Sequence, residues 1–204
     1  PVILLGELTN KKLRRRYHVS DEYDYRENSI YKTYLACDAV SDEVLLRNHY
    51  RCNKEIIGFN NKKYYNSKLK IQSKSKEPEP LVYMDVKSDN TQIKNTSPAE
   101  VEEVVEYALL NKDKSIAVIT PFVNQKQLIE NAIKQNKLSN LVCGTVHAFQ
   151  GDEKDVVLFS TAISERTSSG TYNWLKNNKE LINVATSRAK EKLVLLTNGK
   201  ELER

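Results

Sequence analysis

The sequence contains no long apolar run, no closely spaced cysteines and no phosphate-binding loop. None of its apolar stretches approaches the length that crosses a membrane, which excludes a transmembrane helix and a membrane partner. The opening residues PVILLGELTN lack the basic start and the longer apolar core of a signal peptide. We therefore expect an intracellular protein that resides in the cytoplasm or, in a eukaryote, also in the nucleus.

The cysteine content argues against disulfides and against a zinc site. The three cysteines Cys37, Cys52 and Cys143 are an odd number, and no two of them are close in the sequence. Their spacing matches neither a disulfide framework nor a set of zinc ligands. We expect free thiols in a reducing compartment and no metal site built by this chain.

A phosphate loop of the form Gly-x-x-x-x-Gly-Lys-Ser/Thr is missing. The one Gly-Lys pair is Gly199-Lys200, with Val194 in place of the first glycine and Glu201 in place of the hydroxyl residue. No predicted strand ends in the paired carboxylates that bind magnesium. The chain alone is therefore predicted to hydrolyse no nucleoside triphosphate.

What the sequence does contain is a moderate excess of positive charge. With 204 residues, one substantial domain is the default, and the net charge of +5 permits a polyanionic partner. Five of these cations stand in the short run KKLRRR at residues 11–16. Two interpretations of this run stay open: a solvated, flexible face, or a nucleic-acid patch.

Beyond residue 80 the pattern alternates between strands and helices. Ser97, Pro98 and Glu100 predict the start of a helix, with Ser97 as N-cap and Glu100 as the acid of a capping box. Because the strands are almost wholly apolar, we predict a parallel sheet that is covered on both faces. The predicted strands cover 81–86, 115–120, 141–146, 155–162 and 192–197, and the predicted helices cover 98–110, 124–136 and 179–189.

The first 80 residues are less regular. We predict a strand at 2–5 and helices at 28–37 and 53–65, with exposed polar segments at 11–27 and 68–80.

Four segments together resemble the C-terminal motor domain of superfamily 1 helicases, in the branch with the nonsense-mediated-decay helicase and the Okazaki-processing nuclease-helicase. They are RNHYRCNKEIIGFNNKKYY, AVITPFVNQKQLIENAI, GTVHAFQGDEKDVVLFSTA and LINVATSRAKEKLVLLT, in the order that the family has. The resemblance implies an α/β fold, namely a RecA-like three-layer α/β/α domain with a mainly parallel sheet over residues 28–204. Residues 1–27 would then be the junction from an upstream first motor domain.

The resemblance also implies a site for ATP. Arg51 and Arg188 would be the two arginines that neutralise charge on the transferred phosphoryl group, for which a planar guanidinium is suited. Glu153 would accept hydrogen bonds from the ribose hydroxyls, and Tyr50 would stack on the base.

Two neighbours of Glu153 complete this implied site. Gly151 would allow a tight turn beside the nucleotide, and Gln150 would either hydrogen-bond across the cleft between the motor domains or stabilise the turn. In the family the phosphate loop and the magnesium-binding acids lie in the first motor domain, so ATP with Mg²⁺ would be bound mainly by that domain.

A second set of residues is implied to contact single-stranded nucleic acid. Thr120 and Thr145 would grip backbone phosphates through short hydroxyls at strand ends, and Pro121 and His147 would line the same track. Alternatively, His147 has only a structural role.

The chain departs from the family at its beginning. Gly6 is followed by Glu7, where the family has Gly-Asp-x-x-Gln-Leu, and no glutamine stands at the distance needed to sense the terminal phosphate. The missing upstream half and the start without methionine predict an excised second domain of a larger enzyme.

Two alternatives stay open at this point. One is a catalytically inert domain that binds nucleic acid, and the other is a metal-dependent nuclease centred on Asp85 and Lys87. The sequence leaves undecided whether the strand is DNA or RNA, which way the motor moves, and which other domains accompany it.

Overall fold

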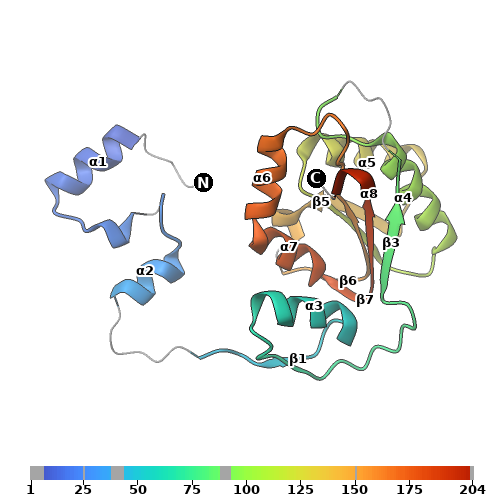
Figure 1. Cartoon of the computed structure of the whole chain (residues 1–204), viewed down its shortest axis with the longest axis horizontal. Coiled ribbons are helices and arrows are strands. Elements are labelled where there is room, and N and C mark those ends of the chain that lie inside the picture. Colours follow the sequence, from blue (N-terminus) through green and yellow to red (C-terminus); the bar gives the residue numbers. More distant parts are fainter. Residues whose placement is uncertain (1–6, 25, 38–43, 88–92, 150, 203–204) are drawn as a thin grey trace. The chain divides into compact units, whose positions relative to one another are not determined.

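A computed structural model describes residues 7–24, 26–37, 44–87, 93–149 and 151–202 of the chain (Figure 1). The chain divides into unit 1, Pro1–Leu45, and unit 2, Leu46–Arg204. The strand predicted at 2–5 and the departure at Gly6 lie outside the described residues. The predicted boundary between residues 27 and 28 stays a prediction.

Unit 2 is built on a five-stranded sheet in which every neighbouring pair is parallel. The strand order is β3-β7-β6-β4-β5, so all five strands begin at one edge of the sheet and end at the opposite edge. We call these the N-terminal edge and the C-terminal edge. The strands are β3 Leu81–Asp85, β4 Ile116–Thr120, β5 Leu141–Thr145, β6 Lys154–Ser160 and β7 Ala189–Thr197.

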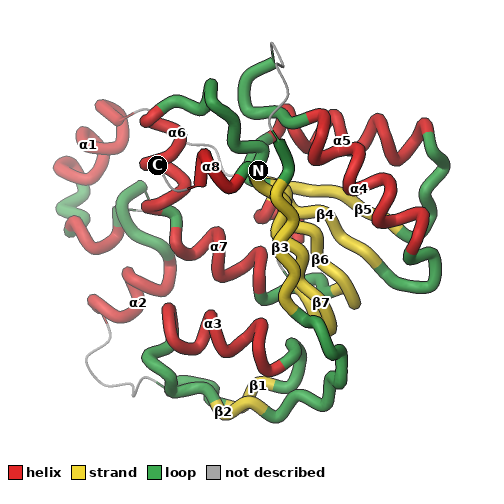
Figure 2. Tube along the Cα trace, turned by 45° about the vertical axis from the view of Figure 1, so that its right-hand side comes forward, coloured by secondary structure: helices red, strands yellow, loops and turns green. Residues whose placement is uncertain are grey.

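Helices cover both faces of this sheet, as Figure 2 shows. The helices α4 (Pro98–Leu110) and α5 (Val123–Gln135) pack on one face. The other face is covered by α3 (Lys54–Tyr64), α7 (Lys179–Thr186) and the 3-10 helix η2 (Val146–Phe149). Layers of helix, parallel sheet and helix confirm the predicted RecA-like α/β/α fold.

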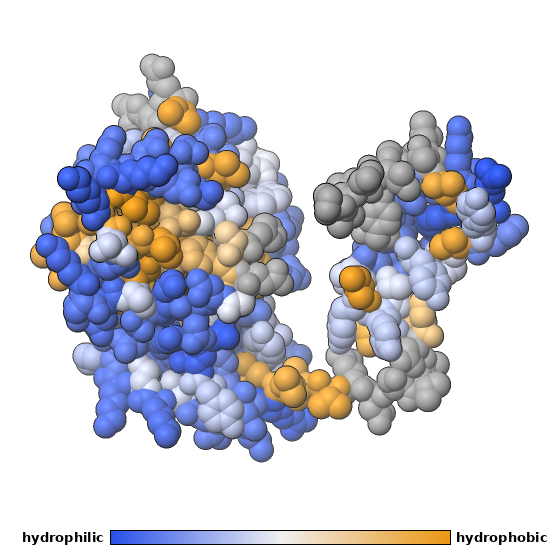
Figure 3. Space-filling model, turned by 180° about the vertical axis from the view of Figure 1, so that it is seen from behind, coloured by the Kyte–Doolittle hydropathy of each residue, from blue (hydrophilic) through white to orange (hydrophobic). Residues whose placement is uncertain are grey.

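Unit 1 contains α1 (Glu7–Arg16), the 3-10 helix η1 (Asp21–Tyr23) and α2 (Ile30–Cys37). Its side chains remain largely in contact with solvent, and Figure 3 shows mostly hydrophilic residues over α1. The described residues of unit 1 that are buried are both polar, Asn10 and Asp24. The described part of the segment predicted at 11–27 as exposed and polar is exposed except for Asp24 and the half-buried Arg14, and its first part is helical.

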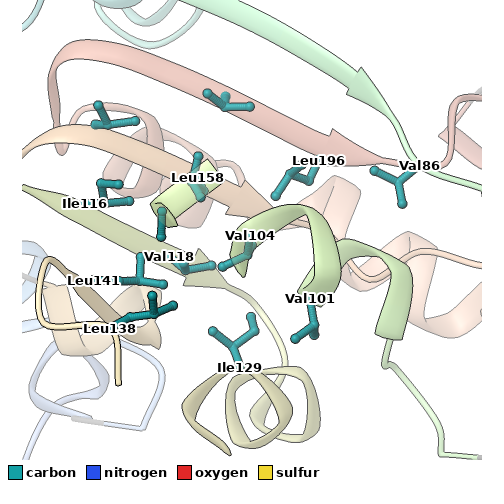
Figure 4. Close-up of a cluster of buried hydrophobic side chains, with 13 residues drawn as sticks. Val86, Val101, Val104, Ile116, Val118, Ile129, Leu138, Leu141, Leu158 and Leu196 are labelled. Atoms are coloured by element: carbon teal, nitrogen blue, oxygen red, sulfur yellow. The ribbon is translucent and has the colours of Figure 1, made fainter. Parts of the chain in front are cut away.

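The core of unit 2 explains why the middle stretches of the strands are apolar. Neighbouring residues of a strand face opposite sides of a sheet, so a strand covered on both faces needs apolar residues throughout. In β4, Val118 contacts the cluster beneath α4 and α5, whereas Ile119 belongs to the cluster beneath α3 and α7. Figure 4 shows the first cluster, in which Val118, Leu158 and Leu196 from three strands meet Val104 and Ile129 from the two helices.

The elements that sequence periodicity missed are short or polar. The helix α6 (Ser169–Asn177) begins after Ser168, whose hydroxyl accepts a hydrogen bond from the Thr171 amide at 3.2 Å. The segment is short and mostly polar, with Tyr172, Trp174 and Leu175 as its large apolar side chains. The remaining elements are β1 (Asn48–His49), β2 (Lys70–Ile71) and α8 (Gly199–Leu202).

Candidate functional site

Three segments that are distant in the sequence meet at the N-terminal edge of the sheet. Arg51 precedes α3, Glu153 directly precedes β6, and Arg188 directly precedes β7. The helix predicted over 179–189 is too long by three residues, since α7 ends at Thr186 and β7 begins at Ala189. Arg188 therefore lies in the turn between a helix and a strand and is not part of the helix.

Backbone hydrogen bonds hold these segments together. The Lys154 amide donates to the Arg188 carbonyl at 3.1 Å, and the Asn53 amide donates to the Lys190 carbonyl at 2.7 Å. The Asn53 side chain also caps α3 by accepting a hydrogen bond from the Glu55 amide at 3.0 Å. The beginning of α3 is thus fixed directly against the beginning of β7, which positions Arg51.

Glu153 is the acceptor at the centre of this edge. One of its carboxylate oxygens lies 2.5 Å from Arg51 Nε, and the other lies 3.2 Å from Lys190 Nζ. Partial burial opposes ionisation of the carboxyl, but the hydrogen bond from Lys190 and the charge of Arg51 outweigh it and hold the pKa of Glu153 below its ordinary value. Glu153 is therefore ionised at neutral pH.

In one group of side chains at this edge, cations outnumber anions. A further ion pair joins Lys154 Nζ to the Asp152 carboxylate at 3.4 Å. Four cations and two anions then stand together, a local excess of two positive charges, and we call this group the basic cluster. Its members are Arg51, Asp152, Glu153, Lys154, Arg188 and Lys190.

Arg188 differs from the other cations of the basic cluster. Its Nε donates to the Val184 carbonyl at 3.2 Å and its Nη1 donates to the Asp152 carbonyl at 3.4 Å. Within the described part of the chain it forms no ion pair with a carboxylate. Burial, and then the nearby charge of Arg51, lower the pKa of Arg188. Its guanidinium is thus oriented by backbone carbonyls rather than by an ion pair.

A buried cysteine supports both arginines. Cys52 Sγ donates to the Ser187 carbonyl at 3.2 Å, and Arg51 Nη1 donates to the same oxygen at 3.4 Å. Burial raises the pKa of Cys52 to about 12, so the thiol stays protonated and keeps its role as donor. The free state predicted for all three cysteines is confirmed. The structural role of Cys52 was not predicted, because nothing in its sequence neighbourhood signals it.

The other residues implied to hold the nucleotide differ in how far the structure describes them. The Tyr50 ring is 68% exposed next to Arg51 and is open to a stacking partner. Gly151 has a φ of +97° with open space around it, so the tight turn at this glycine is present. Gln150 lies outside the described residues.

The residues implied to contact nucleic acid lie at the C-terminal edge. Thr120 and Thr145 are partners in the register of β4 and β5. Thr145 and Pro121 are half-buried, whereas Thr120 is fully buried at 0% exposure and its hydroxyl accepts from the Phe122 amide at 3.4 Å. The side chain of His147 lies outside the described residues. The structure therefore brings the two threonines together, at the edge opposite the basic cluster.

A buried acid at this C-terminal edge corrects one prediction. Ser97 is the N-cap of α4 as predicted, and its hydroxyl accepts from the Glu100 amide at 3.2 Å. Glu100, however, does not complete a capping box. The Ser97 amide donates instead to the Gln125 side chain at 2.8 Å. The predicted role of Glu100 is wrong because a stronger set of donors, at the end of β6, takes its carboxylate.

Those donors are Ser160 and Ala162. The Ser160 hydroxyl donates to one Glu100 oxygen at 2.6 Å, and the Ala162 amide lies 3.0 Å from both oxygens. Gln125 donates in turn to Ser160 Oγ at 3.0 Å. Burial raises the pKa of Glu100 to about 7, although these hydrogen bonds favour the charged form. We call Ser97, Glu100, Gln125 and Ser160 the buried network.

The nuclease alternative finds no support in the placement of Asp85. Its carboxylate accepts a hydrogen bond from the Gly199 amide at 2.8 Å, at the start of α8. Among the described residues no group of three or more histidine, cysteine or acidic side chains is arranged to hold a metal ion. None of the helices in the described ranges is both long and apolar enough to span a membrane.

Comparison with known proteins identifies the family. A family profile described as "AAA domain" matches residues 26–200. Helicase sen1 of Schizosaccharomyces pombe is 30% identical over 186 residues, covering 78% of this chain and 11% of that protein. The DNA replication ATP-dependent helicase/nuclease JHS1 of Arabidopsis thaliana is 34% identical over 104 residues, covering 51% of this chain and 7% of that protein.

A third relative is the RNA helicase Mov10l1 of Mus musculus, 26% identical over 200 residues, with 83% of this chain and 17% of that protein covered. Among solved structures, the C-terminal domain of a possible DNA helicase from Lactobacillus superposes with a TM-score of 0.48 and 19% identity, over 74% of this chain and 88% of that one. The chain spans less than a fifth of the length of each of these three curated relatives.

Proposed function

Because the chain belongs to the AAA domain family, as a C-terminal RecA-like domain of the superfamily 1 helicase type, we propose that it is the second motor domain of an ATP-dependent helicase. In this proposal an upstream RecA-like domain of the same polypeptide binds ATP and Mg²⁺. This chain closes over the nucleotide and grips a nucleic-acid strand.

The observation that carries the proposal is the Arg188 guanidinium, which backbone carbonyls orient and which forms no ion pair with a carboxylate of the described residues. Phosphoryl transfer spreads negative charge over the oxygens of the transferred group, and a guanidinium reaching in from a second domain stabilises that charge. Arg51 donates to the Ser187 carbonyl and Arg188 donates to the Val184 carbonyl, so both guanidinium groups lie at the turn after α7. Together they would supply two such groups. An excess of two positive charges at the cluster fits a polyanion such as a triphosphate.

Residues beside these arginines would hold the nucleoside. A carboxylate offers about four lone-pair sites, and Glu153 uses two of them for Arg51 and Lys190, so capacity remains for the ribose hydroxyls. Exposed Tyr50 would stack on the base. The turn at Gly151 would admit the nucleotide closely, with Gln150 beside it.

At the opposite edge, Thr120, Pro121, Thr145 and His147 would contact the strand. Since the hydroxyl of Thr120 is buried, its contact requires the β4 end to become exposed when the strand binds. Closure around ATP at one edge and reopening after hydrolysis would shift this opposite edge along the strand, which converts hydrolysis into translocation. Both DNA and RNA remain candidate strands.

The test uses the parent polypeptide, extended upstream to include the first motor domain. We expect single-strand-stimulated ATP hydrolysis, and we expect Arg188→Ala to lower it by about 10³-fold or more while strand affinity is kept. Arg188→Lys should restore little, because the ammonium lacks the planar fork. Arg47→Ala, an exposed arginine outside the basic cluster, is the matched control and should hydrolyse ATP like wild type.

Two results would overturn the motor proposal. One is a parent that hydrolyses no ATP, and the other is an Arg188→Ala variant as active as wild type. Loss of strand binding in Arg188→Ala without any hydrolysis in wild type would favour the inert nucleic-acid-binding domain instead.

A further inference from the structure

The short helix α1 has two chemically different faces. Residues four apart lie on the same side of a helix, so Asn10 and Arg14 form one face. Lys11 with Arg15 and Lys12 with Arg16 are the corresponding pairs on the rest of the circumference.

The face with Asn10 and Arg14 holds α1 against the residues that follow it. Asn10 Nδ2 donates to the Asp24 carboxylate at 3.0 Å, and both residues are buried. The Arg14 guanidinium forms ion pairs with the carboxylates of Asp24 and Asp21. These contacts lie entirely within unit 1, and they fix the rotation of α1 about its axis against η1.

The second face presents the remaining cations to solvent. Lys11, Lys12, Arg15 and Arg16 are all exposed, and the contacts of the first face prevent the helix from turning them inward. Like charges four apart on a helix destabilise it, and a helix of ten residues is marginal in isolation. An anionic partner would reduce the repulsion between Lys12 and Arg16.

We propose that this exposed face of α1 binds the phosphate backbone of nucleic acid, as a contact separate from the threonines of unit 2. Arginine and lysine side chains bind phosphates without reading the sequence, and two arginines add bidentate contacts to phosphate oxygens. Nucleic acid is favoured over other polyanions because the inference rests on the proposed function, in which a strand is already engaged by the same chain.

The experiment measures binding of the 204-residue chain to fluorescently labelled oligo-dT and oligo-rU as a function of salt. The probes are about twenty nucleotides long, more than one domain contacts. In the variant Lys12→Gln/Arg15→Gln/Arg16→Gln, affinity near 0.1 M salt should fall roughly ten- to hundredfold. The slope of log K against log salt should decrease in magnitude by about 2, since each phosphate contact to a single strand contributes about 0.7.

A matched variant controls for net charge. Lys112→Gln/Lys134→Gln/Lys137→Gln removes three exposed cations near the ends of α4 and α5, so both variants go from +5 to +2 (5 − 3). Glutamine keeps good helix propensity, and an unchanged circular-dichroism spectrum of the α1 variant verifies its fold. The proposal predicts loss of affinity in the α1 variant and near wild-type affinity in the control.

Three outcomes would overturn the α1 surface: no binding by the wild-type chain, equal losses in the two variants, or an unchanged α1 variant. The last two leave the motor proposal intact, because that proposal is tested separately through hydrolysis by Arg188→Ala. Conversely, if the parent polypeptide hydrolyses no ATP and its α1 variant still loses strand affinity, the motor proposal is rejected and the proposal for α1 is retained.

Discussion

The two edges of the sheet in unit 2 differ in whether their polar side chains are exposed or buried. At the N-terminal edge, charged side chains of the basic cluster are partly exposed and joined by ion pairs, with two positive charges left over. At the C-terminal edge, the buried network contains one acid, Glu100, held by neutral donors. The first arrangement keeps charge accessible to a ligand, whereas the second removes charge from solvent.

This difference predicts that the buried network contributes more to stability than the basic cluster does. Exposed ion pairs contribute little to folding, because water already solvates both partners. A buried acid with its donors is costly to disturb, since every group left without a partner loses a hydrogen bond that water cannot replace. We therefore expect substitutions in the buried network to destabilise the protein strongly and substitutions in the basic cluster to leave it folded.

The largest effect is expected for Glu100→Ala. The substitution leaves the Ser160 hydroxyl and the Ala162 amide without their acceptor and opens a cavity beneath α4. We expect the free energy of unfolding to fall by about 3–5 kcal/mol. Urea denaturation followed by circular dichroism measures this loss. Glu100→Gln retains an acceptor oxygen and should lose clearly less, and equal losses in the two variants would contradict the assigned role of the hydrogen bonds.

A pH effect of the next size follows from the same residue. The pKa of Glu100 is raised to about 7 in the folded protein from an ordinary value of 4.5. Its contribution to stability is therefore fully present below about pH 4.5 and is lost as pH rises through about 7, a change on the order of 3 kcal/mol. Glu153 has a lowered pKa, so its smaller contribution runs the other way and is lost on acidification.

The difference between wild type and Glu100→Gln isolates the effect of Glu100 on this pH dependence. Unfolding in urea at about pH 5 and about pH 8 should show wild type losing more stability with rising pH than Glu100→Gln does. Identical pH dependence in the two proteins would show that Glu100 does not titrate between these values.

The sequence predicted the sheet and most of its helices well, for a physical reason. Strands such as β4 are buried on both faces, so their apolar character is continuous and cannot be mistaken for a surface segment. Helix α6 was missed because it is short and mostly polar, and because it is stabilised by a cap and by tertiary contacts such as that between Phe122 and Trp174. The end of α7 was misplaced because a turn at Ser187 and Arg188 separates it from β7.

At the site, sequence patterns identified single residues but not their partners. Arg51, Glu153 and Arg188 were implied by motifs, and the structure places them together. The contribution of Cys52 depends on a contact with Ser187, 135 residues away, and that of Lys190 on a contact with Glu153, and one sequence reveals neither contact. Glu100 was assigned to a local capping box because local patterns carry no information about Ser160, sixty residues away.

Two glycines in the passage from β5 to β6 offer a smaller test of the two edges. At Gly144, an added Cβ would lie 2.8 Å from Phe149 Cε2 and 3.1 Å from Ala148 Cβ. Phe149 is buried and cannot move freely, so Gly144→Ala should cost about 1–3 kcal/mol of stability. At Gly151 nothing lies within 4 Å, and Gly151→Ala should cost only about 1 kcal/mol, through its φ of +97°. A larger loss at Gly151 than at Gly144 would reverse the predicted order.

The smallest effect is expected for Glu153→Gln at the N-terminal edge. The substitution removes the carboxylate charge that Arg51 and Lys190 share, and all three side chains are about one-third exposed or more. We expect the free energy of unfolding to change by less than about 1 kcal/mol, with a difference that shrinks further in high salt. Urea denaturation at low and high salt measures both quantities. A loss as large as that of Glu100→Ala would mean that the basic cluster is a structural element, and the contrast between the basic cluster and the buried network would fail.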